Sequence, residues 1–284
     1  MDGRIKTLGI IVLSLCACGP ADDEFLDDEF FDDALEFRGD RLDTGLVAGG
    51  GGGTTANPGR GGGEGGWVSN SLALPNVSGI QPSYGLDNTL GMAEAYGLLT
   101  TTEGRKTAEY LVECALPADH SITKTIDGQS VVFYGHLGLA PQWESGSCDN
   151  TCQAWVSACL LARTNVTQQP VDLWLQADHP AIGFGLPPSG EAMVLEASYY
   201  GNLFWGGSFL HFCEGEEDGM VASVREGRTC ASGSCGFTNY GSCTTVADRC
   251  TMGGPNGDVP IDCRSDMPLY GPTWPTISTY LPAE

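Results

Sequence analysis

The sequence predicts an α+β fold: a disulfide-stabilised single domain with a few helices, a β-hairpin and short strands, preceded by a disordered acidic and glycine-rich tether. Three observations support this prediction. Apolar residues recur at helical spacing in some segments and in short strand-like runs in others. Ten cysteines follow residue 100, and residues 18–66 are too rich in acidic residues and glycine to form a core.

The first residues carry an export signal. Arg4 and Lys6 precede an apolar run at residues 8–15, which is too short to span a membrane. The order of an apolar residue, any residue, a small residue and then Cys18 resembles the bacterial lipobox, in which the cysteine is acylated and the chain is cut just before it. We therefore expect residues 1–17 to be a lipoprotein signal peptide and Cys18 to be lipidated.

Two alternatives to acylation at Cys18 stay open. Cys16 is a second acceptor, although the residue before it is Leu where the lipobox has a small one. An ordinary secretory signal cleaved near Ala17 or Ala21 would keep export and remove the anchor. Gly19, rather than Asp, follows Cys18, which favours an outer-membrane-anchored lipoprotein that faces the periplasm or the cell surface.

Residues 18–66 are predicted to form a disordered tether. Acidic side chains dominate the first half and glycine the second, so the segment cannot bury enough apolar surface to offset its ordering entropy. The alternative is a short recognition motif of Phe25, Phe30 and Phe31 that folds onto a basic groove.

The charge of the chain excludes one class of partner. The formal net charge is −23 with only 13 Lys and Arg residues, so no basic stripe is present to neutralise phosphates. We expect no nucleic-acid binding and a membrane contact through the lipid anchor. Composition does not identify a protein or carbohydrate ligand.

Residues 67–284 have the length of one domain with a sizeable core. Their ten cysteines are an even number in an oxidising compartment, which predicts five disulfides without specifying the pairing. Five of these cysteines lie within residues 229–264, which predicts a cysteine-rich loop subdomain. The disulfide candidates are Cys114, Cys148, Cys152, Cys159, Cys213, Cys230, Cys235, Cys243, Cys250 and Cys263.

The first part of the domain is predicted to be helical and then to form a hairpin. Two helical pieces are expected within residues 88–117, the second beginning after Thr101 and ending at Pro117. Asp127 and Gly128 stand between two β-prone runs and predict a tight hairpin turn, because Gly adopts positive φ at no steric cost.

A further helix is predicted over residues 149–164, which open with side-chain oxygens suited to an N-cap. Cys152, Trp155 and Cys159 share one face of that helix, which we expect to face the core. A strand is expected at residues 171–176, followed by short apolar runs between glycines that predict more strands.

Several segments resemble one group of proteins. They are similar to cysteine-rich lipoproteins that myxobacteria encode in multiple copies. The resemblance implies an exported, anchored protein of a Gram-negative envelope and supplies no catalytic residue. The segments are Ala115-Leu-Pro117, the hairpin end Tyr134-Gly135, Leu137-Gly-Leu-Ala140-Pro-Gln-Trp143, the helix from Gln153 to Arg163, and Tyr200-Gly-Asn-Leu-Phe204.

Motifs for a metal or a cofactor are missing from the sequence. His120, His136, His179 and His211 have no His-x-x-x-His spacing, and the cysteines of residues 229–264 form no Cys-x-x-Cys pair. Neither a nucleotide-binding glycine loop nor a c-type haem motif is present, so we expect no cofactor and no metal. The alternative is a copper or zinc site between His120 and His136, which flank the predicted hairpin.

No catalytic residue is predicted, because the serine elbow Gly-x-Ser-x-Gly is absent. Cys152 at a helix start could act as a nucleophile with His120, His136 or His179 as its base, but Cys148 four residues earlier indicates a disulfide. Glycosidase-type carboxylate pairs leave no spacing signature. Candidates for such a pair are Glu144, Asp178, Glu191 and Glu196.

Tryptophans could line a carbohydrate site, although most are expected to fill the core. Taken together, the sequence favours a non-catalytic binding or envelope-associated lipoprotein of unknown specific role. The alternative is an extracytoplasmic hydrolase whose site is assembled by the fold. The tryptophans are Trp67, Trp143, Trp155, Trp174, Trp205 and Trp274.

Overall fold

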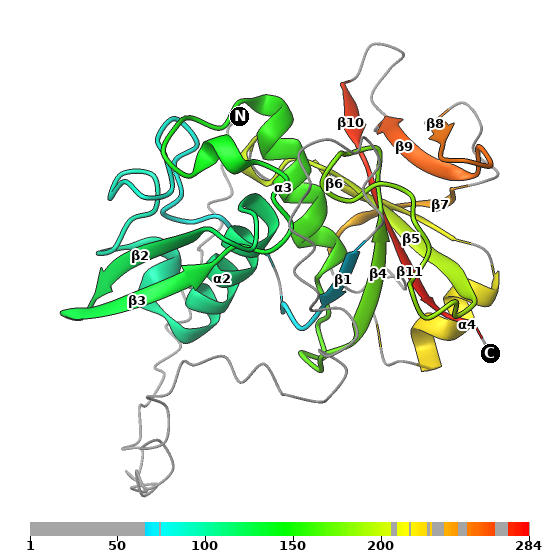
Figure 1. Cartoon of the computed structure of the whole chain (residues 1–284), viewed down its shortest axis with the longest axis horizontal. Coiled ribbons are helices and arrows are strands. Elements are labelled where there is room, and N and C mark those ends of the chain that lie inside the picture. Colours follow the sequence, from blue (N-terminus) through cyan, green and yellow to red (C-terminus); the bar gives the residue numbers. More distant parts are fainter. Residues whose placement is uncertain are drawn as a thin grey trace, which may run out of the picture. The chain divides into compact units, whose positions relative to one another are not determined.

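The structure is a computed structural model that describes residues 66–73, 75–205, 209–215, 217–225, 228, 236–243, 249–264 and 272–283. The described part is an α+β fold in which helices pack on a mixed sheet and a separate hairpin (Figure 1). This confirms the predicted fold class. The predicted signal peptide and tether, with Cys18 and the Phe25, Phe30 and Phe31 motif, lie outside the described residues.

The main sheet has six strands in the order β1-β4-β11-β5-β6-β7. Neighbouring strands are antiparallel except for the parallel pair β6 and β7. The sheet therefore joins strands from both ends of the described chain. Its strands are β1 (Gly66–Ser69), β4 (Asp172–Gln176), β11 (Ile277–Pro282), β5 (Met193–Gly201), β6 (Leu210–Glu214) and β7 (Thr238–Ser242).

Two smaller sheets complete the strands. A three-stranded sheet has the order β10-β9-β8, from Thr273–Pro275, Val259–Arg264 and Cys250–Gly253. The residues 229–264 thus contribute β7, β8 and β9. The predicted hairpin is confirmed as β2 (Ser121–Ile126) and β3 (Gln129–Tyr134). Asp127 and Gly128 both have positive φ, 52° and 80°, as a two-residue hairpin turn requires.

The helices begin where side chains cap them. Helix α2 (Thr102–Ala115) begins after Thr101, whose Oγ1 accepts the N–H of Gly104 at 3.0 Å, and helix α3 (Asn150–Ala162) begins after Asp149, whose Oδ1 accepts the N–H of Cys152 at 2.9 Å. Both predicted helices are confirmed. The remaining helical elements are the 3-10 turns η1 (Gly97–Thr100), η2 (Pro141–Trp143) and η3 (Leu203–Trp205), and helix α4 (Glu217–Arg225).

One predicted helical piece is wrong. Residues 88–96 are irregular, and only η1 precedes α2. The side-chain oxygen of Asn88 accepts the N–H of Leu90 at 2.8 Å, a local bond that competes with helix formation. Gly91 also approaches the carbonyl of Gly85 so closely that a Cβ would lie 1.8 Å from that oxygen. This contact is made between backbone segments and cannot be inferred from helical periodicity.

Four disulfides join described cysteines. Cys114–Cys159 links α2 to α3, and Cys148–Cys152 closes a short loop at the start of α3. Cys213–Cys243 and Cys250–Cys263 lie at the β6–β7 edge and in the three-stranded sheet. Cys230 and Cys235 lie outside the described residues, so eight of the ten candidates are paired here.

Helix α3 is buried between the main sheet and α2. Its residues from Val156 to Ala162 are all buried, in one core with Leu111, Tyr199 and Phe212. Cys152 and Cys159 face this core as predicted, while Trp155 is half-buried and its ring lies 4.9 Å from that of His179. The mostly apolar surface of α3 reflects a helix that is covered nearly all round.

A β-bulge in strand β5 turns a carboxylate into this core. On β11, Thr279 pairs with Ala197 and Tyr280 pairs with Leu195, so Glu196 is an extra residue between them. Strict alternation would place Glu196 on the face opposite Ala197. The bulge instead lets the Glu196 carboxylate reach Thr279, whose Oγ1 donates to Oε2 at 2.7 Å.

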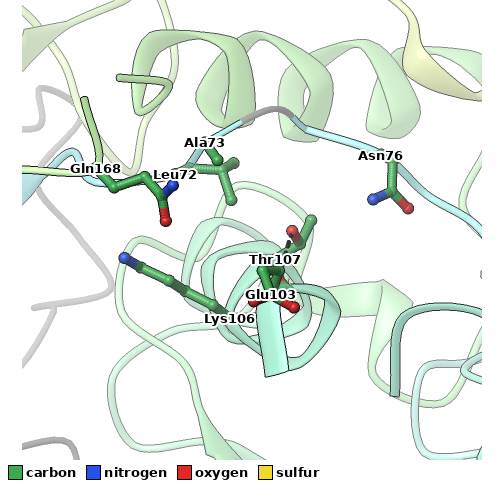
Figure 2. A pocket seen from close by; sticks show the side chains of 7 residues that line it. All are labelled: Leu72, Ala73, Asn76, Glu103, Lys106, Thr107 and Gln168. Atoms are coloured by element: carbon green, nitrogen blue, oxygen red, sulfur yellow. Dashed lines mark hydrogen bonds between the residues drawn. The ribbon is translucent and has the colours of Figure 1, made fainter. Parts of the chain in front are cut away.

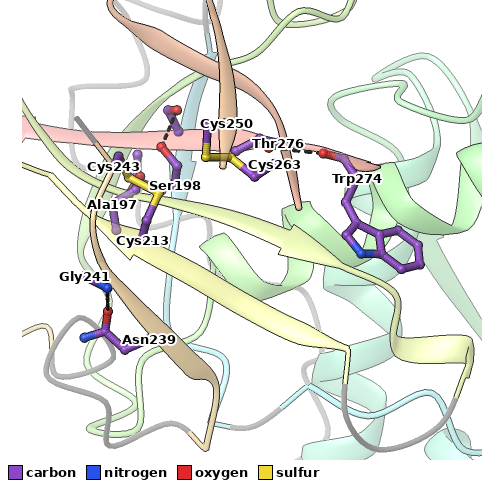
Figure 3. The surroundings of a disulfide bond; sticks show 12 residues. Ala197, Ser198, Cys213, Asn239, Gly241, Cys243, Cys250, Cys263, Trp274 and Thr276 are labelled. Atoms are coloured by element: carbon purple, nitrogen blue, oxygen red, sulfur yellow. Dashed lines mark hydrogen bonds between the residues drawn. A yellow bond between two sulfur atoms is a disulfide. The ribbon is translucent and has the colours of Figure 1, made fainter. Parts of the chain in front are cut away.

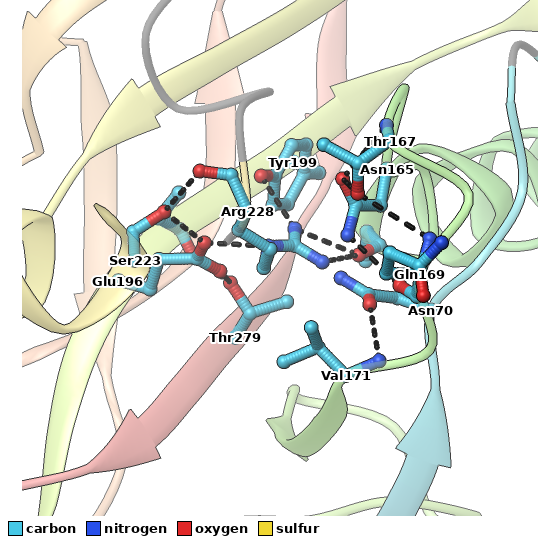
Figure 4. Close-up of polar contacts among 12 residues, drawn as sticks. Asn70, Asn165, Thr167, Gln169, Val171, Glu196, Tyr199, Ser223, Arg228 and Thr279 are labelled. Atoms are coloured by element: carbon cyan, nitrogen blue, oxygen red, sulfur yellow. Dashed lines mark hydrogen bonds and ion pairs between the residues drawn. The ribbon is translucent and has the colours of Figure 1, made fainter. Parts of the chain in front are cut away.

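The Glu196 carboxylate forms a fully buried ion pair with Arg228 (Figure 4). The Nε of Arg228 donates to Glu196 Oε1 at 2.5 Å, and both side chains are 0% exposed. Both terminal nitrogens of Arg228 donate to the carbonyl of Ala162 at 3.0 Å, and one also donates to the Tyr199 hydroxyl at 2.8 Å. Ser223 Oγ donates to the same Oε1 at 2.9 Å. The pair therefore joins β5, β11, α4 and the end of α3.

We predict that Arg228→Ala will lower the free energy of unfolding by about 3–5 kcal/mol, because it leaves the Glu196 carboxylate buried without its cation. Equilibrium urea unfolding measures the change. Arg105→Ala is the matched control, since the Arg105–Asp127 pair has side chains 28% and 86% exposed and its loss should cost at most about 1 kcal/mol. Equal losses in the two variants would contradict the structural role of the buried pair.

Candidate functional site

The most distinctive surface feature is an irregular loop, residues 79–97, which we call the tyrosine loop. It contains the isolated bridge between Ile80 and Met92 but no regular helix or strand, and it ends at the first residue of η1. Tyr84, Leu90 and Tyr96 are 41%, 47% and 52% exposed. Irregular loops of this length in a compact domain are uncommon and are often functional.

Glycines allow the tyrosine loop to fold back on itself. Gly79 and Gly97 have φ of +78° and +77°, and a Cβ on Gly97 would lie 2.3 Å from the carbonyl oxygen of Ser78. A Cβ on Gly85 would lie 2.5 Å from the Cα of Ser145. The loop is therefore packed backbone to backbone, which only glycine permits at these positions.

Buried side chains of neighbouring elements anchor the loop. Lys124 of β2 is 1% exposed, and its Nζ donates to the carbonyls of Asp87 and Asn88 at 3.2 and 2.9 Å. Burial lowers the pKa of Lys124, an effect opposed by the nearby Glu94 and Asp87 carboxylates. The Nε1 of the fully buried Trp143 donates to the carbonyl of Tyr84 at 3.1 Å. The backbone that carries the exposed Tyr84 ring is thus held in one conformation.

Polar groups accompany the exposed rings. The Nε2 of Gln81 donates to the Tyr96 hydroxyl at 3.3 Å, and Glu94 Oε1 accepts the N–H of Thr125 at 3.0 Å. Tyrosine, serine, glycine and asparagine dominate natural recognition loops, because Tyr offers a large amphipathic contact at low entropic cost. The tyrosine loop contains two Tyr and four Gly among its residues, and its backbone is held by Lys124 and Trp143.

The histidines do not form a metal site among the described residues. Within the described ranges, one group of three possible ligand side chains lies within 4.8 Å of one another. Its members are Cys213, Cys250 and Cys263, which belong to two disulfides. His120 Nδ1 instead lies 2.5 Å from Glu144 Oε2, with Asp119 3.8 Å from the other ring nitrogen. His136 is exposed and supplies no third ligand to such a group.

Two further histidines are used by the fold. The Nδ1 of His179 accepts the N–H of Ala181 at 3.1 Å, and burial lowers the pKa of His179. His211 is 3% exposed, and its ring lies 5.5 Å from that of Tyr200 and 5.3 Å from that of Tyr240. Both imidazoles lie within packed surroundings rather than at an open surface.

The structure gives Cys152 a structural role, because it forms a disulfide with Cys148 and both residues are 3% exposed. A thiolate nucleophile at this position is therefore absent from the oxidised protein. The four candidate carboxylates are also not brought together by any ion pair or hydrogen bond within the described ranges. Glu196 pairs with Arg228, Glu144 contacts His120, and Asp178 and Glu191 are exposed.

Most tryptophans fill the core, as expected. Trp143, Trp174 and Trp274 are buried, at 0%, 3% and 3% exposed, and Trp67 and Trp155 are half-buried. Trp205 is 43% exposed, with its ring 5.0 Å from that of Trp274. Within the described part of the chain, the six rings do not line one carbohydrate groove.

A small cavity is lined by the first turns of α2, by residues 72, 73 and 76 and by Gln168 (Figure 2). Its volume is about 50 Å³, which accommodates one or two water molecules, whereas ligand pockets usually exceed about 300 Å³. Lys106 and Glu103 line it, together with Leu72, Ala73, Asn76, Thr107 and Gln168. The cavity is therefore too small to hold an organic substrate.

We predict that Lys124→Met will loosen the tyrosine loop, because the thioether cannot donate to the carbonyls of Asp87 and Asn88. Hydrogen–deuterium exchange should become faster at the amides of residues 86–92, as their opening free energy falls. Lys106→Met is the control, since Lys106 lines the cavity on α2 and makes no bond to the loop. Unchanged exchange at residues 86–92 in Lys124→Met would contradict the anchoring.

Comparisons with known proteins identify no relative of this chain. No family model, no curated protein and no solved structure matches the chain. Within the described ranges, every helix is too short or too polar to cross a membrane.

Proposed function

We propose that this chain is an exported, lipid-anchored binding protein of a bacterial envelope, with the tyrosine loop as its ligand-contacting surface. The observation that carries the proposal is the combination of exposed Tyr84 and Tyr96 with the buried anchors Lys124 and Trp143. A fold gains no stability from leaving aromatic rings in water, whereas a rigid aromatic surface binds ligands at a small entropic cost.

The disulfides support an extracytoplasmic location for this binding role. Four of them occur in the described domain, and such density is typical of proteins that fold in an oxidising compartment. Attachment through Cys18, and a place on the outer membrane facing the periplasm or the cell surface, follow from the lipobox-like sequence and belong to the proposal.

Carbohydrate is the ligand class that the chemistry of the loop favours. Tyrosine faces stack on sugar rings, and the amides of Gln81 and Asn88 can bond to hydroxyl groups. The chain has a net charge of −23, and Asp87 and Glu94 lie in the loop itself. We therefore propose a neutral rather than an anionic polysaccharide, since like charges repel.

A hydrolase is the second candidate, and the contact between His120 and Glu144 is the observation in its favour. A carboxylate that orients an imidazole is a common arrangement for a general base. However, no serine hydroxyl or thiol within the described ranges is bonded to the His120 ring. The binding role is the better supported one, because the exposed rings of Tyr84 and Tyr96 and the anchors that hold the loop are all present in the described residues.

The binding role predicts that Tyr84→Ala/Tyr96→Ala will weaken binding to immobilised neutral polysaccharides at least tenfold, since aromatic anchors contribute about 1–2 kcal/mol each. Affinity electrophoresis or interferometry with a panel of neutral and anionic polysaccharides measures the change. Tyr134→Ala is the matched control, because Tyr134 is 63% exposed on β3 outside the loop. Unaltered binding by the double variant, or preference for anionic chains, would refute the proposal.

The anchor predicts that Cys18→Ala will abolish incorporation of an alkyne-tagged fatty acid when the full chain is expressed in a Gram-negative host. The same change should leave an unprocessed precursor, because the lipobox-like cleavage depends on the acylated cysteine. Cys16→Ala is the control and should keep the label. Labelling that depends on Cys16 instead, or on neither cysteine, would remove the assignment of Cys18.

A further inference from the structure

Two disulfides lie against each other in a second buried cluster (Figure 3). The Sγ atoms of Cys213, Cys250 and Cys263 all lie within 4.8 Å of one another, and Cys243 is bonded to Cys213. We call these four residues the sulfur cluster. Their exposed fractions are 1%, 1%, 7% and 0% for Cys213, Cys243, Cys250 and Cys263.

Backbone pairing, as well as the sulfur bonds, holds these cysteines together. Cys250 and Cys263 are direct partners in the antiparallel pair β8 and β9. The N–H of Cys243 donates to the carbonyl of Glu214 at 2.7 Å, which places Cys243 beside Cys213 on β6. The four side chains would therefore stay close together if both disulfides were reduced.

The surroundings of the sulfur cluster are mostly apolar. Tyr200, Trp274 and Ala154 belong to the same buried cluster as the four cysteines, and Met252 is partly buried against that cluster. No carboxylate or imidazole of the described ranges joins the group of mutually close ligand atoms. Sulfur-only sites in apolar surroundings select soft and borderline cations such as Zn²⁺ and Cu⁺.

A compensating positive charge is close by. The guanidinium carbon of Arg249 lies 4.0 Å from the centre of the Tyr240 ring, and Tyr240 is packed against the buried cluster that contains the four cysteines. Arg249 directly precedes Cys250 in the chain. A cation at this position would offset the negative charge that four thiolates bring to a metal.

We propose that the sulfur cluster is a convertible centre: two disulfides when oxidised, and a tetrathiolate site for Zn²⁺ when reduced. Zinc–sulfur bonds of about 2.3 Å in a tetrahedron set the sulfurs about 3.8 Å apart. The Sγ atoms of Cys213, Cys250 and Cys263 lie within 4.8 Å of one another, so the unbonded pairs among them need to approach by about 1 Å or less. The bonded sulfur pairs, at 2.09 and 2.10 Å, have to separate by about 1.7 Å after reduction.

Reduction of the sulfur cluster needs an external two-electron donor for each disulfide. Each disulfide accepts two electrons from a phosphine, whose phosphorus takes oxygen from water and becomes a phosphine oxide, while the sulfurs take up two protons. The four thiols then lose their protons as Zn²⁺ binds, so metal binding releases protons. This inference does not depend on the tyrosine loop or its ligand.

The test uses the full chain reduced with a phosphine under anaerobic conditions and titrated with Co²⁺ in place of Zn²⁺. We expect the thiolate-to-cobalt absorption of a tetrahedral site and one bound ion that Zn²⁺ displaces. Cys250→Ser/Cys263→Ser should lose this absorption. Cys148→Ser/Cys152→Ser should keep it, because it removes two thiols that lie outside the sulfur cluster. Absorption that persists in the first variant, or is lost in the second, would overturn the proposal.

A measurement on the unmutated chain decides the matter if either variant fails to fold. The reduced chain is alkylated with and without Zn²⁺, and the labelled peptides are identified by mass. Selective protection of Cys213, Cys243, Cys250 and Cys263 by Zn²⁺ is the expected result. Protection spread evenly over all cysteines, or no protection, would refute the site.

Discussion

The buried ion pair between Glu196 and Arg228 is the interaction on which the rest of the domain depends. It joins the central strands of the main sheet to the end of α3 through the carbonyl of Ala162. Burial alone would disfavour both charges, but the Glu196 carboxylate and the Tyr199 hydroxyl together keep the pKa of Arg228 above its ordinary value. Every charged atom of the pair has a partner, which is the condition for a buried pair to be retained.

This constraint organises the packing around it. Because Arg228 draws the carboxyl end of α3 onto β5, the helix is fixed over the sheet, and Cys114–Cys159 then fixes α2 to α3. The hairpin β2 and β3 follows α2, and its Lys124 anchors the tyrosine loop. The irregular tyrosine loop is thus held by hydrogen bonds from side chains that are buried in the core. Disulfides add local restraints where regular structure is short.

Several potentially reactive side chains of the protein take part in structural contacts. Cys152 is closed in a disulfide, Glu196 neutralises a buried cation, and His179 accepts a backbone N–H. The groups that would serve a catalyst are therefore mostly engaged in structure, while aromatic side chains are left at the surface. Within the described residues, Cys152, Glu196 and His179 therefore serve the packing of the domain.

Local rules made parts of the fold predictable. The cap at Asp149 and the turn at Asp127-Gly128 depend on residues within one or two turns of the chain, and both elements are as predicted. An even cysteine count also indicated a disulfide framework without its pairing, because connectivity is a property of spatial neighbours. The first helical piece was wrong, since hydrophobic spacing does not register the backbone contact between Gly85 and Gly91.

The sequence by itself determined the α+β class, the helix starts, the hairpin and the expectation of export. Only the tertiary structure decided the bulge that turns Glu196 inward, the anchoring of the tyrosine loop by Lys124 and the meeting of four cysteines in one cluster. These features join residues between 30 and more than 80 positions apart. Local propensity acts over a few residues, whereas such contacts depend on the whole chain folding and on which groups burial then forces together.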